Sequence, residues 1–376
     1  MSTVAPYDLG PLASIALVGA VLALGPVAWV WRRQRVHGPA ARLRALTLLT
    51  LCLTFDLVLF GAFTRLTDSG LGCPDWPGCY GQSNPLAAHA QISAAQSVLP
   101  QGPVTHGKAW IEMTHRYLAT GVGALIVVLA LLSWIEARRG RATLSPWWAS
   151  ATLLWVCVQG AFGALTVTMK LYPLIVTLHL LGGMALLAVL AVQVARMRDA
   201  RVGLPAPLWR GALALALLSA VQIALGGWVS TNYAVLACDG FPSCQGSWWP
   251  AMDFEHGFAL LRELGSGKDG AELPFAALTA IHYVHRLVAY ALLLAMAAFA
   301  WRLRVHGLKR PWGWLVAGIG LWQLASGLSN VVLGWPLIGA VAHTAGAAAW
   351  VIVLTLLIAG AQAAPTTAFR RMHAFP

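Results

Sequence analysis

Nine long apolar segments constrain this chain more than any other feature of its sequence. Each is close to or above the length, roughly 20 residues, at which a helix crosses the hydrocarbon of a bilayer. A helix also satisfies its backbone hydrogen bonds internally, as a lipid environment demands. The predicted spans are Pro11–Trp31, Ala45–Phe63, Ala109–Trp134, Trp147–Thr168, Leu171–Ala195, Leu208–Ser230, Pro274–Trp301, Trp312–Leu333 and Leu337–Ala361. Only 10% of the residues are charged, against about a quarter in a soluble domain. We therefore expect an all-α integral membrane protein.

The basic residues predict how the chain is oriented. One side holds 18 of the 25 lysine and arginine residues, in the segments after the first, third, fifth and seventh spans, at Arg210 and in the C-terminal tail. The positive-inside rule makes this side cytoplasmic and places the N-terminus outside. The first basic residue is Arg32, which argues against a cleaved signal peptide. The net charge of +12 is thus mostly a topology signal, and we expect no nucleic-acid partner.

Rare residues recur in the same order in two parts of the chain. Cys73–Gly81 reads CPDWPGCYG and Cys238–Gly246 reads CDGFPSCQG, at an offset of 165 residues. Matches at similar offsets pair His115-Arg116 with His285-Arg286, Gln159 and Gly163 with Gln323 and Gly327, and His179 with His343. A shift by four spans preserves orientation, so the repeat is parallel. We expect two tandem four-helix bundles, residues 45–207 and residues 208–376 with the tail, after an extra N-terminal transmembrane helix and basic loop in residues 1–44.

Four histidines lie inside the predicted spans at similar depth: His115, His179, His285 and His343. All four spans run from outside to inside. At about 1.5 Å rise per residue, the histidines lie roughly 10–16 Å below the outer surface. A single histidine here could be a hydrogen-bonded packing residue, but ionisable residues inside a bilayer are functional candidates. Four at one depth favour a functional site.

Two imidazoles in one four-helix unit suit a six-coordinate haem iron, with one ligand from each of two helices. The pattern predicts two haem sites, one between His115 and His179 and one between His285 and His343. Zinc is the alternative metal, but it normally takes three or four protein ligands. No cluster of cysteines or carboxylates in the sequence supplies the remaining ligands.

The two halves differ three residues before the first histidine of each pair. Glu112 precedes His115, whereas His282 precedes His285. Residues three apart share a helix face, so both are expected to project toward a haem edge. Glu112 either moves protons or stabilises a cation there, or is a charge near the start of the span. His282 is an alternative ligand or a hydrogen-bond donor. We hypothesise that the first half performs chemistry and that the second holds a redox haem.

Three arginines and one aspartate are further candidates. Arg116 and Arg286 follow the first histidine of each pair and either bind carboxylates such as haem propionates or extend to the membrane surface. Arg65 is a third candidate for the same task. Asp56 lies at the depth of the histidines and is expected to orient a ligand imidazole.

Each long outer loop holds a cysteine pair, Cys73 with Cys79 and Cys238 with Cys244. Disulfides are stable outside the cytoplasm, and the short spacing permits a bridge in each pair. The bridges are either structural or redox-active. Cys52 and Cys157 lie in spans and are expected to be buried small apolar residues.

These residues resemble the haem A synthase family, from the second span to the ninth. The shared motifs are Gly61–Cys73 (GAFTRLTDSGLGC), Glu112-x-x-His115-Arg116, His179, His285-Arg286 and His343. The family is an eight-span protein of two similar four-helix halves, which oxidises the C8 methyl of haem O to the formyl group of haem A. The extra first span departs from that pattern.

The resemblance implies a role for each motif. Substrate haem O would bind between His115 and His179, with Glu112 as the catalytic residue and Arg116 in the same haem site. A resident haem b cofactor would bind to His285 and His343, with Arg286 beside it. The cysteine pairs match family members with outer-loop disulfides. The resemblance further implies a bacterial cytoplasmic (inner) membrane location, and haem O synthase and terminal oxidase assembly factors as partners.

Two other function classes remain open from the sequence. A bis-haem electron-transfer cytochrome without substrate chemistry would need the same four histidines, but the unmatched Glu112 favours the enzyme. A parallel-repeat transporter would place its polar residues near the midplane and at broken helices. Here the polar residues cluster toward the outer leaflet, which disfavours a transporter.

Overall fold

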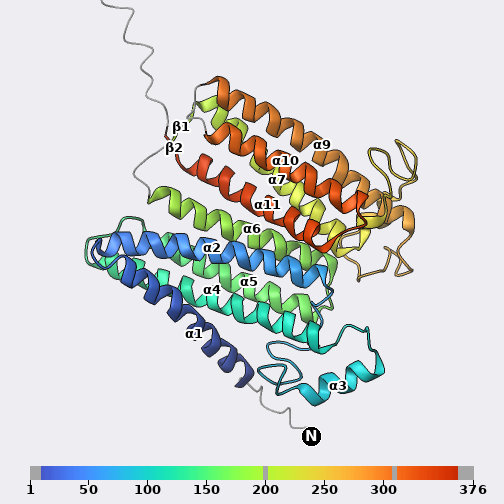
Figure 1. Cartoon of the computed structure of the whole chain (residues 1–376), viewed down its shortest axis with the longest axis horizontal. Helices are drawn as coiled ribbons and strands as arrows, with labels where there is room; N and C mark the ends of the chain where they lie inside the picture. Colours follow the sequence, from blue (N-terminus) through green and yellow to red (C-terminus); the bar gives the residue numbers. More distant parts are fainter. Residues whose placement is uncertain (1–9, 198–201, 307–310, 363–376) are drawn as a thin grey trace, which may run out of the picture.

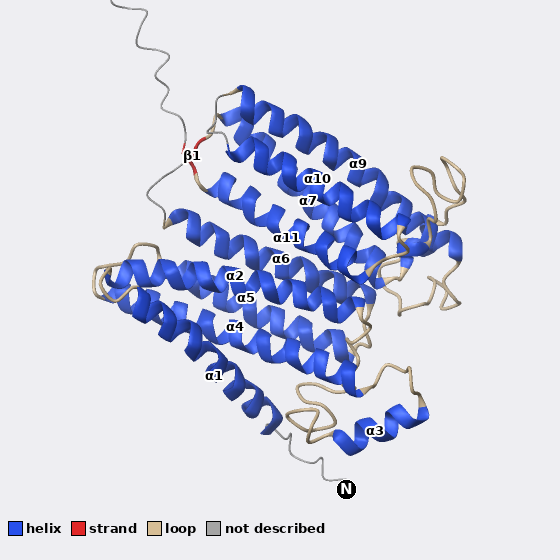
Figure 2. Ribbon diagram, viewed as in Figure 1, coloured by secondary structure: helices blue, strands red, loops and turns tan. Residues whose placement is uncertain are grey.

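The computed structural model describes residues 10–197, 202–306 and 311–362 (Figures 1 and 2). Within these residues nine helices are long and apolar enough to span a membrane, which confirms the predicted spans. They are α1 (Gly10–Arg33), α2 (Gly38–Leu66), α4 (His106–Arg138), α5 (Pro146–Thr168), α6 (Pro173–Arg196), α7 (Ala206–Thr231), α9 (Phe275–Val305), α10 (Pro311–Val332) and α11 (Leu337–Ala359). The chain is an all-α, multi-pass membrane protein. Six basic residues that contribute to the predicted orientation lie outside the described residues: Arg198, Arg201, Lys309, Arg310, Arg370 and Arg371.

Short elements mark the two ends of the helix bundle. At one end, the long loops contain α3 (His89–Val98), the 3₁₀ turn η1 (Ala234–Leu236) and α8 (Phe254–Gly257). We call this the disulfide end. At the other end, β1 (Val202–Gly203) pairs in parallel with β2 (Ala361–Gln362). We call this the basic end, because arginines occupy the last turns of α1, α4, α6 and α9 there.

The helices form two groups of four that lie side by side (Figure 1). In the first group α2 contacts α4 and α6, while α5 also contacts both α4 and α6. In the second group α7, α9, α10 and α11 contact one another in the same order. Between the groups α6 packs on α11, α2 on α11 and α7 on α6. The repeat pairs α2 with α7 and α6 with α11, so the contact of α2 with α11 corresponds to the contact of α7 with α6. This reciprocity is what a two-fold relation between the groups requires.

The sequence repeat is also visible in the backbone. Residues with left-handed φ recur at matching places: Asp68 with Tyr233, Tyr80 with Gln245, and the Lys170-Leu171 turn with Gly334-Trp335, where only Gly334 is a glycine. Left-handed φ is uncommon for residues with a Cβ. Its recurrence at offsets of 164 or 165 residues shows that the connections as well as the helices repeat.

Helix α1 is additional to the repeat and packs on α4 and α2. Its buried residues are Pro11, Ile15, Gly19, Ala23 and Val30, and the first four recur at every fourth position and form one stripe. A Cβ on Gly19 would lie 2.7 Å from Thr120 of α4, so the helices cross at this glycine. Small residues allow this close approach, which supplies the van der Waals packing that holds membrane helices together.

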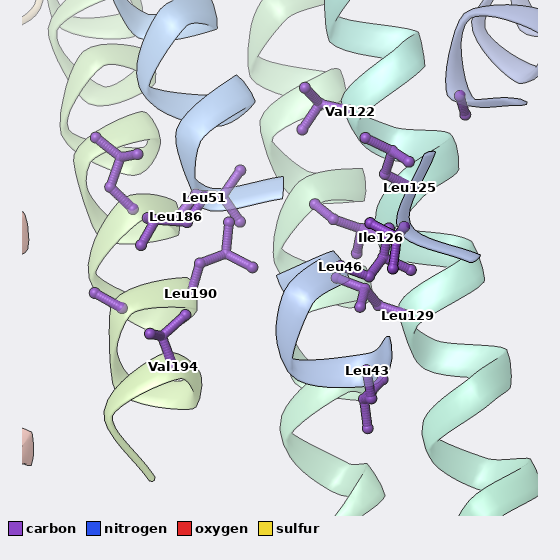
Figure 3. Close-up of a cluster of buried hydrophobic side chains, with 14 of the residues drawn as sticks. Leu43, Leu46, Leu51, Val122, Leu125, Ile126, Leu129, Leu186, Leu190 and Val194 are labelled. Atoms are coloured by element: carbon purple, nitrogen blue, oxygen red, sulfur yellow. The ribbon is translucent and has the colours of Figure 1, made fainter. Parts of the chain in front are cut away.

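The largest apolar clusters fill the basic half of each group. In the first, Leu43, Leu46 and Leu51 of α2 contact the stretch 122–129 of α4 and the stretch 186–194 of α6 (Figure 3). In the second, a matching cluster joins the starts of α7 and α10 to the ends of α9 and α11. The four histidines of the spans lie beyond these clusters, toward the disulfide end.

Candidate functional site

The four histidines project from helices that begin at the disulfide end. His115 lies on α4 and His179 on α6, while His285 lies on α9 and His343 on α11. All four are half-buried. His115 and His179 are near enough for a charge on one to act on the other, and so are His285 and His343. The structure thus brings together the two members of each predicted pair.

Each imidazole lies against a glycine of a neighbouring helix. The contacts pair His115 with Gly61, His179 with Gly163, His285 with Gly226 and His343 with Gly327. A Cβ on these glycines would lie 3.0, 3.5, 3.1 and 3.2 Å, respectively, from the Cε1 atom of the ring. The glycines also repeat, Gly61 with Gly226 and Gly163 with Gly327. The missing side chains let each ring approach the neighbouring helix closely. This repeated glycine was the signal in the sequence that could have revealed the contact.

The rings differ between the halves in their hydrogen bonds. The Nδ1 atoms of His115 and His179 are buried and have no hydrogen-bond partner among the described residues. In the second half, Gln222 Nε2 lies 3.0 Å from His285 Nδ1, and Ser326 Oγ lies 3.0 Å from His343 Nδ1. Sequence reasoning did not assign a role to Ser326.

Glu112 is buried beside the first disulfide loop. Its Oε2 accepts a hydrogen bond of 2.7 Å from the backbone N–H of Cys73, and its Oε1 accepts one of 2.5 Å from Arg116. Both oxygens therefore have partners, and only 4% of the residue is exposed. In the second half His282 takes this place and accepts a hydrogen bond from Arg286 Nε.

Arg116 and Arg286 both bind backbone carbonyls of the disulfide loops. Arg116 Nη1 donates to Asp75, Pro77 and Gly78 at 2.5–3.0 Å. Arg286 donates to Gly240 and Ser243 through Nη1 and to Cys238 through Nη2. Gly240 and Ser243 are the repeat equivalents of Asp75 and Gly78. Sequence reasoning did not predict that these arginines bind loop carbonyls, because every residue has a backbone carbonyl and the sequence does not indicate which ones accept a hydrogen bond.

Both predicted cysteine pairs are disulfide-bonded, Cys73 to Cys79 and Cys238 to Cys244. All four cysteines are buried between their loop and the bundle. The bridges close the loops that Arg116 and Arg286 hold. Each loop thus covers the end of the four-helix group nearest its histidines.

Arg65 joins the two halves. It donates to Ser230 O and to the Tyr233 hydroxyl, and it pairs with Asp68. Tyr233 donates to Asp68 at 2.7 Å. Burial raises the pKa of the Tyr233 phenol above its usual value, so the hydroxyl stays protonated and able to donate. These contacts connect the end of α2 to the end of α7.

Asp56 is exposed and has no hydrogen bond to an imidazole. Instead it lines a cleft of roughly 460 Å³ with Arg44, Cys52 and Phe55, between α2, α6 and α11. The expected role in orienting a histidine is therefore not supported. The side chain in contact with an imidazole is Gln222, whose repeat equivalent is Leu57 rather than Asp56.

The prediction that Cys52 and Cys157 are buried is wrong, because both are exposed on the helix surface. Lipid is as apolar as a helix interface. A small apolar side chain in a span is therefore equally stable facing either one.

Comparison with known proteins places the chain in a family. The sequence profile of the COX15-CtaA cytochrome oxidase assembly protein family matches residues 44–357. The chain belongs to this family. It is also 37% identical over 313 residues to the haem A synthase of Shewanella oneidensis, covering 82% of this chain and 93% of that protein.

Haem A synthases of other bacteria are similar over comparable lengths. The Caulobacter vibrioides enzyme is 30% identical, covering 81% of this chain and 91% of its own. The Halalkalibacterium halodurans enzyme is 28% identical, covering 76% and 86%. The family match begins in α2 and leaves α1 outside it, in agreement with the expectation of one extra span.

Proposed function

We propose that this chain is a haem A synthase, a membrane oxidoreductase that converts the C8 methyl of haem O to the formyl group of haem A. Besides family membership, one structural observation supports the proposal. The two halves have matched histidines, glycines, arginines and disulfide loops, yet Glu112 in the first half is replaced by His282 in the second. A buried carboxylate beside only one of two matched sites favours one reacting site and one supporting site.

The residues present fit haem iron better than another metal. Two half-buried imidazoles per half are the donor set of a six-coordinate haem, and each ring lies against a glycine, where a side chain would crowd it. The buried Nδ1 atoms of His115 and His179 are without partners among the residues that the structure describes. Among the described residues, no three His, Cys, Asp or Glu side chains are grouped as a metal ion would require. The zinc alternative therefore lacks ligands in this part of the chain.

In this proposal the first half, residues 45–207, binds substrate haem O through His115 and His179. Glu112 is the catalytic residue. Its carboxylate moves a proton or stabilises positive charge at the oxidised carbon. Arg116 acts in the same haem site through the loop that it holds, and it keeps the Glu112 carboxylate in one orientation by the ion pair.

The second half, residues 208–376, binds the resident cofactor through His285 and His343. Haem b would supply electron transfer when bound there. Arg286 contributes to this cofactor site by holding the second disulfide loop. The bridges Cys73–Cys79 and Cys238–Cys244 have a structural role in this proposal.

The cellular setting follows from the same proposal. The protein spans the cytoplasmic (inner) membrane of a bacterium, with its N-terminus and the disulfide end outside and its C-terminus in the cytoplasm. A prenylating haem O synthase supplies the substrate, and terminal oxidase assembly consumes the product. Helix α1 is an additional anchor that packs on the substrate half.

The test is to purify the protein and to identify its extracted haems by chromatography. Haem b together with haem O or haem A is the expected result. Haem b alone, at two per chain, would instead support an electron-transfer cytochrome, which the matching glycine contacts of the four imidazoles would also suit. A preparation without haem would overturn both functions.

Single substitutions assign the two sites. His115→Ala and His179→Ala should remove haem O and haem A, whereas His285→Ala and His343→Ala should remove haem b. His37→Ala is the matched control, because His37 lies between α1 and α2 at the basic end. If the same haem disappears from all four variants, the assignment of one haem to each half is wrong.

A further inference from the structure

The two histidine pairs differ in how their rings are held, although their helices and glycine contacts match. We propose that Gln222 and Ser326 are positioning residues that fix His285 and His343 as permanent haem ligands. The first half lacks both and is built to release its haem. This inference rests on the proposed function and deepens it, because it identifies residues that separate a resident haem from an exchangeable one.

The geometry at Ser326 sets the direction of its hydrogen bond. Its hydroxyl donates to the carbonyl of Trp322 at 2.7 Å. Because a hydroxyl has one proton, the oxygen then accepts at its other contact, 3.0 Å from His343 Nδ1. His343 therefore carries its proton on Nδ1 and presents Nε2, with its lone pair, as a metal ligand.

Gln222 provides the corresponding contact for His285. Its Nε2 donates to the His285 carbonyl at 3.2 Å and lies 3.0 Å from Nδ1 and 3.3 Å from Nε2 of the ring, while its Oε1 is buried without a partner among the described residues. Rotation of the amide by half a turn exchanges its two ends. Oε1 then accepts from a protonated Nδ1, in exchange for the hydrogen bond that Nε2 now donates to the His285 carbonyl. An iron bound to Nε2 requires this tautomer.

The first half has apolar residues at the two equivalent positions. The repeat that aligns Gly226 with Gly61 aligns Gln222 with Leu57, and the repeat that aligns Gly327 with Gly163 aligns Ser326 with Phe162. Neither side chain has an oxygen or nitrogen that could accept a hydrogen bond from Nδ1–H. The buried Nδ1 atoms of His115 and His179 consequently have no acceptor in the structure.

A hydrogen bond from Nδ1–H fixes the ring and makes the imidazole a stronger ligand. Loss of such a partner typically lowers metal affinity about 10–100-fold. An enzyme whose substrate and product are both haems must exchange one haem while it retains the other. The histidines of the second half, which would retain its haem, have hydrogen-bond partners for Nδ1, and those of the first half, which would exchange its haem, have none among the described residues.

The experiment compares the intact protein with two variants. Gln222→Leu introduces the residue found at the equivalent position of the first half, and Ser326→Ala removes only the hydroxyl. Two quantities are measured on the detergent-purified protein: the midpoint potential of haem b, and the rate at which haem b passes to apomyoglobin. We expect roughly 10–100-fold faster loss of haem b in each variant, and a more positive potential, because a less basic imidazole stabilises the oxidised iron less. Ser326→Thr, which keeps the hydroxyl, should restore both values.

Ser329→Ala is the matched control, because Ser329 lies on the same helix and bonds only to the Ser326 carbonyl. The converse variant Leu57→Gln should slow the loss of haem O or haem A to apomyoglobin. Unchanged haem b potential and loss rate in Gln222→Leu and Ser326→Ala would overturn this inference. That result would leave the proposed function intact as long as His285→Ala still removes haem b. If His285→Ala retains haem b, the proposed function itself fails.

Discussion

The carboxylate of Glu112 accepts a hydrogen bond from the backbone N–H of Cys73, although the two residues are 39 positions apart in the chain. Cys73 is bridged to Cys79, and Arg116 connects Glu112 to the carbonyls between them. The candidate catalytic carboxylate, the arginine and the disulfide therefore form one unit. A change in any of them should alter the others.

Glu112→Gln should lower turnover of haem O about 10²–10⁴-fold, the usual contribution of a residue that transfers a proton. Haem content should change little, because glutamine has nearly the same shape. Glu136→Gln is the control, since Glu136 is another buried glutamate of α4 but pairs with Arg139 and Arg141 at the basic end. Turnover by Glu112→Gln equal to that of the control would exclude a catalytic role.

Replacing Cys73 and Cys79 together with serine should lower the free energy of unfolding by about 2–4 kcal/mol, as loss of a disulfide typically does. The change should also reduce turnover, because the Cys73 N–H no longer holds Glu112 in place. Thermal denaturation and haem O turnover measure the two effects. Cys52→Ser, at an exposed free cysteine, should alter neither. Full turnover with an unbridged loop would show that Glu112 does not depend on the disulfide.

Arg286→Ala should destabilise the second disulfide loop. Its removal leaves the carbonyls of Gly240, Ser243 and Cys238 without their donor. Each buried acceptor left without a partner costs about 1–3 kcal/mol. We expect a lower unfolding temperature and faster hydrogen exchange in residues 238–246. Arg302→Ala, at an exposed arginine of the same helix, is the control, and exchange equal to that of the control would contradict the assigned contact.

Gly327→Ala should disturb the ring of His343, because the added Cβ would lie 3.2 Å from its Cε1. The ring must move by a few tenths of an ångström, which should lower haem b content and broaden its absorption bands. On the same helix, Gly318 has nothing within 4 Å of an added Cβ, so Gly318→Ala should leave the spectrum unchanged. Identical spectra for the two variants would show that the glycine contact does not constrain the ligand.

Much of this architecture could be predicted from single stretches of sequence. The spans follow from apolar length, because the bilayer imposes a local requirement on each helix. The repeat follows from rare residues such as Cys73, Cys238, His115 and His285, whose order survives in both halves. Contacts that depend on how each helix is rotated about its own axis were harder to predict from the sequence. Asp56 and Cys52 were expected at the site or in the interior, yet they lie on the exposed face of α2.

The sequence by itself predicted nine apolar spans, which the described residues contain as nine long helices, and it predicted the repeat and which four histidines to expect at one depth. Only the tertiary structure decided that Arg116 and Arg286 bind loop carbonyls, that a glycine faces each ring, and that Gln222 and Ser326 contact the imidazoles of the second half alone. The physical reason is the apolar solvent. In lipid, a helix can be apolar on every side, so composition does not reveal which face packs inward, and close packing between specific side chains makes that choice.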